Sequence, residues 1–202
     1  MLAKTGRMDD ETRFQAAIAA FDADQARDPA HPRALVEAER LSACVLRLDE
    51  NASVALRLAA RCQHLERWSV PRDTYPAGRI GYLKWRKDLA RLHADRAAEI
   101  LRGVGYDEGV VEAVRAINLK RDLKQNRDAQ TMEDALCLVF LEYELEAFLD
   151  KYPDEAKAVD ILQKTWRKMI ERGHAVALSL SLSARAAALV SRALAEPGAG
   201  PG

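Results

Sequence analysis

Apolar residues recur at intervals of three and four along almost the whole chain of 202 residues, and no stretch alternates apolar and polar residues as a strand would. This period matches the α-helix, in which such residues gather on one face. Hydrophobic residues make up 49% of the sequence and charged residues 31%, a balance that excludes a disordered chain. The sequence therefore predicts an all-α protein with a single compact domain of about eight helices.

Capping residues, prolines and glycines set the expected ends of these helices. Two prolines and a glycine in residues 69–78 break the pattern and predict a loop. Residues 1–195 are expected to form the domain, and residues 196–202 a disordered tail. The first two expected helices begin at Asp9 or Asp10 and at Pro32, and the last is capped by Ser183. The helices between them are expected over residues 54–68, 79–101, 107–117, 136–148 and 154–171. A capping-box-like sequence at Thr131–Asp134 opens helix 136–148, and Gly173 follows the end of helix 154–171.

The formal net charge is zero, but the charges are segregated. Residues 57–102 hold eleven lysines and arginines against five acidic residues, and residues 103–156 hold six against thirteen. One explanation is that the two blocks pack against each other. No apolar run is long enough for a membrane span, and the three cysteines form no pairwise motif, which is typical of a reducing compartment. We expect a cytoplasmic protein that makes no membrane contact.

The segment around His64 is the first candidate site. On a continuous helix, Arg61, His64 and Trp68 share one face, and Arg67 lies three residues beyond the histidine. Guanidinium groups bind phosphate in a bidentate manner, and histidine can ligate a metal or transfer a proton. The alternative is a histidine that bonds a neighbouring backbone group, with solvated arginines around it.

Arginines and aromatic residues alternate again in the next segment. Tyr75 lies in the predicted loop, and Arg79, Tyr82 and Arg86 follow along one helical face with Trp85 beside them. Such interleaving suits phosphate binding and base stacking, and it is equally typical of a helix that covers a core. Lys164 and Lys168, one turn apart on a later helix, either extend a phosphate-binding wall or decorate the surface.

His93 lies farther along the predicted helix 79–101. If this helix and helix 54–68 are antiparallel neighbours, His64 and His93 face each other. Two histidines and a carboxylate on facing helices are typical ligands of a metal in a helical protein. Asp134 and Glu142 on the most apolar helix are the candidate carboxylates, with helix capping and an arginine ion pair as their respective alternatives.

The runs R61–W68, P71–P76, G81–R86, E133–E142 and K164–K168 resemble an uncharacterised family of helical proteins whose members have been labelled glutamyl-tRNA synthetase. The chain has neither the nucleotide-binding sheet nor the signature motifs of such an enzyme. The order His64, His93, Asp134 is more distantly similar to the HD-domain metal phosphohydrolases. That resemblance implies an HD-domain-like fold and one divalent metal ion. The sequence departs from it at Ala94, where the family has the aspartate of its His-Asp doublet.

Three hypotheses follow. The first is a metal-dependent phosphohydrolase acting on a phosphorylated small molecule or nucleotide, with His64, His93 and Asp134 around the metal. The second is a non-catalytic module that binds RNA or another polyanion, with Trp68, Tyr75 and Trp85 as stacking residues. The third is a structural or partner-binding protein. The expected substrate-binding residues are Arg61, Arg67, Trp68, Tyr75, Arg79, Tyr82, Trp85, Arg86, Glu142, Lys164 and Lys168.

Overall fold

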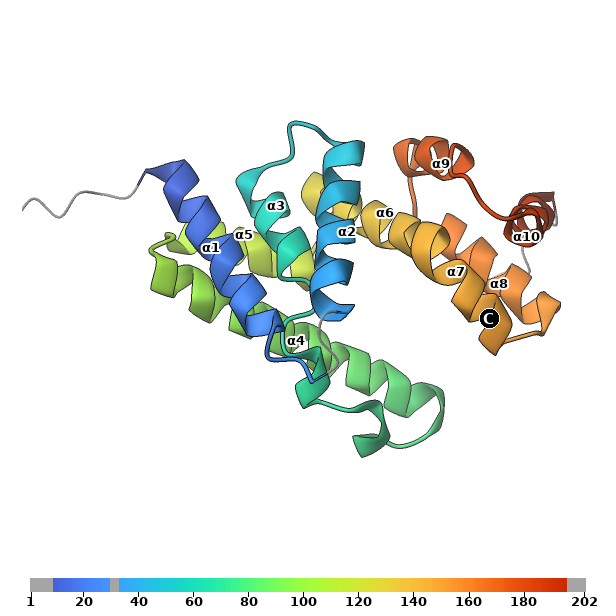
Figure 1. Cartoon of the computed structure of the whole chain (residues 1–202), viewed down its shortest axis with the longest axis horizontal. Coiled ribbons are helices and arrows are strands. Elements are labelled where there is room, and N and C mark those ends of the chain that lie inside the picture. The colour runs from blue at the N-terminus through green and yellow to red at the C-terminus, as the bar shows by residue number, and fades with distance from the viewer. Residues whose placement is uncertain (1–8, 30–32, 196–202) are drawn as a thin grey trace, which may run out of the picture.

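A computed structural model describes residues 9–29 and 33–195, and within these ranges the chain forms ten α-helices and no strand (Figure 1). The predicted all-α class is confirmed. The helices are α1 (Asp10–Gln25), α2 (Arg33–Leu48), α3 (Val54–Arg61), α4 (Gly78–Val104), α5 (Glu108–Asn118), α6 (Arg127–Val139), α7 (Leu145–Lys151), α8 (Glu155–Trp166), α9 (Glu171–Leu178) and α10 (Ala184–Ala195). Pro32 and residues 196–202, which carry two of the predictions, lie outside the described ranges.

Side-chain caps begin several helices where the sequence predicted them. Asp9 accepts a hydrogen bond from the backbone N–H of Thr12, and Ser53 and Asp107 cap α3 and α5 in the same way. The predicted start at Thr131 is wrong. Asn126 accepts from the Ala129 N–H instead, so α6 begins one turn earlier.

Two predicted helices are each divided, which accounts for ten helices in place of about eight. The expected helix 136–148 is interrupted by one π-helical turn, Phe140–Glu144, between α6 and α7. The expected helix 154–171 stops at Trp166, and α9 starts after Ile170. Gly173 lies inside α9, packed against Asp134, and does not end a helix.

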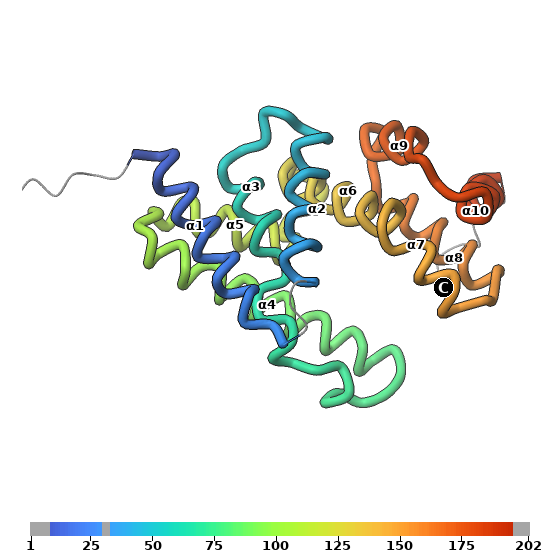
Figure 2. Tube along the Cα trace, viewed as in Figure 1, coloured from blue at the N-terminus to red at the C-terminus, as the bar shows by residue number. Residues whose placement is uncertain are grey.

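One continuous apolar core includes buried side chains from all ten helices. Within it α2 packs against α3 and α6, α4 packs against α5 and α1, and α8 packs against α10. Figure 2 shows that the chain between α3 and α4 makes a long excursion, so this segment and the first half of α4 project from the remaining helices. The excursion supplies much of the candidate site.

Candidate functional site

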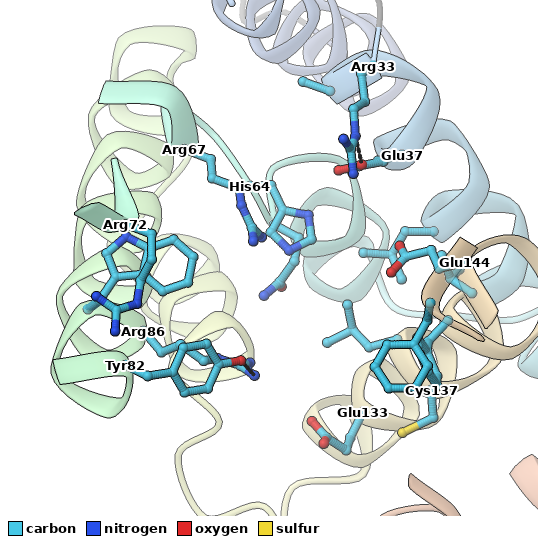
Figure 3. Close-up of a pocket in the computed structure, with 18 of the residues that line it drawn as sticks. Arg33, Glu37, His64, Arg67, Arg72, Tyr82, Arg86, Glu133, Cys137 and Glu144 are labelled. Atoms are coloured by element: carbon cyan, nitrogen blue, oxygen red, sulfur yellow. Dashed lines mark hydrogen bonds and ion pairs between the residues drawn. The ribbon is translucent and has the colours of Figure 1, made fainter. Parts of the chain in front are cut away.

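A cavity of about 1000 Å³ lies between α2, the segment that precedes α4, the first turns of α4, and the helices α6 and α8 (Figure 3). Its volume is at the upper end of the range of about 300–1,000 Å³ that is usual for small-molecule sites. The lining contains seven basic side chains and four carboxylates, so the cavity is positive overall. The basic residues are Arg33, Arg67, Arg72, Arg86, Lys120, Lys164 and Lys168, and the acidic ones are Asp28, Glu37, Glu133 and Glu144.

His64 reaches the cavity from an irregular turn and not from a helix. The structure ends α3 at Arg61, and Glu66 adopts a left-handed backbone conformation with φ of 54°. The predicted helical face of Arg61, His64 and Trp68 is therefore wrong. His64 and Trp68 line the cavity, whereas Arg61 points to α1 and makes a bidentate ion pair with Asp22 at 2.6 and 2.8 Å.

The imidazoles of His64 and His93 lie in contact, with ring centroids 5.9 Å apart and the rings edge to face. His93 is buried on α4, and its Nδ1 lies 2.5 Å from the Leu65 carbonyl oxygen. Since a carbonyl only accepts, Nδ1 of His93 carries the proton. The segment after α3, and not α3 itself, brings the two histidines together.

Both histidines are held in the neutral form. Burial lowers the pKa of His64 to about 3, with further lowering by Arg67 and by His93. Burial also lowers the pKa of His93 to about 4, against the opposing effect of its bond to the Leu65 carbonyl. At neutral pH the cavity therefore presents His64 as an uncharged imidazole that can accept or donate a hydrogen bond.

Asp134 does not join the two histidines. It is fully buried, accepts hydrogen bonds from Gln130 and from the backbone N–H of Ile170, and packs against Gly173. Burial raises its pKa. In the part of the chain that the structure describes, no three His, Cys, Asp or Glu side chains are grouped closely enough to hold a metal ion. The expected ligand set of His64, His93 and Asp134 is therefore not assembled.

Arg67 and Arg86 form the basic wall of the cavity, together with Tyr82 and Trp85. The Arg67 guanidinium lies 5.4 Å from the Trp85 ring centroid, and that of Arg86 lies 5.9 Å from the Tyr82 ring centroid. Arg86 also donates to the Tyr82 hydroxyl at 3.4 Å. Both arginines are exposed, and within the described ranges their side chains contact these rings and form no ion pair, so both charges are available to a ligand.

Arg72, which the sequence did not single out, shapes this wall. Its guanidinium donates to the carbonyl oxygens of Tyr75 and Pro76, both at 2.9 Å. Trp85 is buried and donates to the Val70 carbonyl oxygen at 2.9 Å. The two bonds of Arg72 hold the loop together, and the bond of Trp85 ties the loop to α4, so together they restrict the positions of the arginines.

Three of the remaining expected binding residues lie outside the cavity lining. The Tyr75 hydroxyl donates to Asp88 at 3.0 Å, Arg79 is exposed, and Glu142 pairs with Arg47 at 2.6 Å. Lys164 and Lys168 do line the cavity, as the wall hypothesis requires.

The opposite wall is acidic, and the sequence analysis missed it. Glu37 accepts from Arg33 at 2.8 Å, and the buried Glu133 pairs with Lys120. Glu144 comes from the π-helical turn, whose extra residue shifts the side chains that follow it. The apolar pattern of helix 136–148 contains no sign of this turn, although the burial of Glu133 could have been expected from its apolar neighbours.

The structure thus defines an all-α protein with a charged, partly enclosed cavity. The model of one family, a domain of unknown function called DUF4202, matches residues 15–190. The chain belongs to this family. No curated protein and no solved structure matches this chain. Among the helices of the described residues, none combines the length and the apolar character that crossing a membrane requires.

Proposed function

We propose that this protein binds a phosphorylated small molecule in the cavity, with the phosphate between Arg67, Arg86 and His64. One observation carries the proposal: two guanidinium groups that have no carboxylate partner among the described residues line a cavity of about 1000 Å³ beside an uncharged imidazole. Figure 3 supports it, because the labelled side chains of Arg67, His64 and Arg86 all reach into the same space.

Charge-assisted hydrogen bonds favour this arrangement. Arg67 and Arg86 are exposed to the space that a ligand would occupy, and a phosphate dianion would replace the water around them with such bonds. Such bonds contribute roughly 1.5–3 kcal/mol each. A neutral His64 complements them, since it can donate a hydrogen bond to one phosphate oxygen or accept one from the hydroxyl of a monoanion.

A concave site favours a small ligand over RNA. The stacking surface expected for RNA needs exposed rings, but Trp85 is buried and the Tyr75 hydroxyl is bonded to Asp88. Metal-dependent hydrolysis on an HD-domain-like scaffold draws less support than binding, because Asp134 is bonded elsewhere and the described residues give the histidine pair no third ligand.

The test is an NMR titration with inorganic phosphate of the wild type and of the variants Arg67→Ala and Arg86→Gln. We expect each variant to weaken phosphate binding by about tenfold or more, which corresponds to the loss of one charge-assisted bond. Arg91→Gln is the matched control, because Arg91 is exposed on the same helix and does not line the cavity. Equal weakening in the control, or none in either cavity variant, refutes the proposal.

A further inference from the structure

Glu144 has a distinct position on the acidic wall. It belongs to the π-helical turn between α6 and α7, and Figure 3 shows its carboxylate pointing from that wall into the cavity, toward His64. Within the described ranges this carboxylate makes no ion pair or hydrogen bond. Burial, and next the nearby charge of Glu37, raise the pKa of Glu144.

Glu37 and Glu133, two other carboxylates of the cavity lining, already have cationic partners. Glu37 binds Arg33, and Glu133 binds Lys120 and lies 3.8 Å from Lys168. A ligand could therefore bind Glu37 or Glu133 only by breaking an existing ion pair. Among the described residues this leaves a carboxylate without a direct cationic partner on one wall and two guanidinium groups without a direct carboxylate partner on the other.

From this arrangement we infer that the ligand is zwitterionic: a phosphate ester that also carries an ammonium group, with the phosphate at Arg67 and Arg86 and the ammonium at Glu144. The inference rests on the proposed function and names its substrate class. Glu144 is exposed to the space that the ligand would occupy, and a bound ammonium would give this carboxylate the direct cationic partner that it lacks among the described residues. The volume of the cavity, about 1000 Å³, leaves room for an organic chain between the two charged ends.

The choice of an ammonium over a neutral donor follows from charge. A bound ammonium would attract the Glu144 carboxylate through its charge, whereas a hydroxyl carries no net charge that could do so. The amine should therefore be recognised by its charge as well as by its hydrogen bonds.

The experiment compares ω-aminoalkyl phosphates of increasing chain length with the ω-hydroxyalkyl phosphates of the same length, by NMR titration of the full chain. We expect one chain length at which the amine binds at least about tenfold more tightly than its hydroxyl counterpart, in line with one charge-assisted bond. Glu144→Gln, which keeps the shape of the side chain, should abolish this gain, so that the amine and hydroxyl compounds of that length bind with equal affinity. Glu50→Gln, an exposed carboxylate outside the cavity lining, should preserve the gain.

A second variant keeps the inference testable if Glu144→Gln disturbs the fold. Glu144→Asp withdraws the carboxylate by one methylene, so the best aminoalkyl phosphate should become longer. An amine gain that persists in Glu144→Gln, or no gain at any length while the hydroxyalkyl phosphates still bind through Arg67 and Arg86, overturns the inference and leaves the proposed function standing. If no phosphate ester binds, both fail.

Discussion

His93 offers a test of the site through pH. It is buried, with 4% of its surface exposed, and its pKa lies at about 4 against an ordinary value of 6.5. The unfolded chain therefore binds a proton between these values that the folded protein does not bind, and the free energy of unfolding decreases as the pH falls below 6.5. The contribution of His93 is complete above that pH and is lost progressively down to about pH 4.

The expected size follows from linkage. The loss at pH 5 is about 2 kcal/mol, and it approaches about 3 kcal/mol below pH 4, because one pKa unit corresponds to about 1.36 kcal/mol. His93→Asn removes the titrating ring and keeps an amide that can donate to the Leu65 carbonyl oxygen. Its free energy of unfolding should therefore decrease by about 2 kcal/mol less than that of the wild type between pH 7.5 and pH 5.

Urea unfolding followed by circular dichroism at the two pH values measures this difference. In each protein the change in the free energy of unfolding between the two pH values is taken, so that the cost of the substitution itself cancels. His64 and the carboxylates titrate in both proteins and so contribute to both changes. If the wild type and His93→Asn lose the same free energy of unfolding between the two pH values, His93 is not held neutral by burial and the reasoning is refuted.

Three further predictions use other parts of the structure. Gly81→Ala should cost about 1–3 kcal/mol in thermal unfolding and weaken phosphate binding, because the new Cβ would lie 1.9 Å from the Pro76 carbonyl oxygen; unchanged phosphate affinity would contradict the role of this contact. Glu133→Gln should strengthen phosphate binding severalfold in the same titration, since it frees Lys120 from its ion pair, and weaker binding would show that the lysine does not face the ligand. Cys62, which is fully buried and outside the cavity lining, should react with a thiol reagent at pH 8 only after unfolding, because burial raises its pKa to about 12; rapid labelling of Cys62 in the folded protein would contradict this.

Local patterns in the sequence predicted the parts of the fold that depend on local physics. Spacing of apolar residues gave the helical class, and short-range side-chain caps at Asp9, Ser53 and Asp107 gave helix starts, because each cap bonds a residue three positions away. The divisions of two helices depend on tertiary contacts instead. The start of α9 follows Ile170, whose N–H is bonded to Asp134, and that distant partner leaves no local pattern.

The candidate site was predicted in part, for the same reason. Arg67, Arg86 and His64 were expected as site residues because arginines, aromatic residues and a histidine are interleaved in this part of the sequence, and they do line one cavity. Arg61 was assigned to the same face because a continuous helix was assumed, whereas α3 ends at that residue and its guanidinium pairs with Asp22. The acidic wall was missed, since Glu144 reaches the cavity through a π-helical turn that apolar spacing does not reveal.

The central claim is that Arg67, Arg86 and His64 hold a phosphate group. Tungstate has the tetrahedral shape and double negative charge of phosphate, and it scatters X-rays anomalously, so a crystal soaked in tungstate locates the anion directly. The account predicts an anomalous peak within hydrogen-bonding distance of both guanidinium groups and the His64 ring, and no such peak in crystals of the Arg67→Ala, Arg86→Ala double variant. Tungstate bound elsewhere with the cavity empty, or a peak that survives in the double variant, would contradict it.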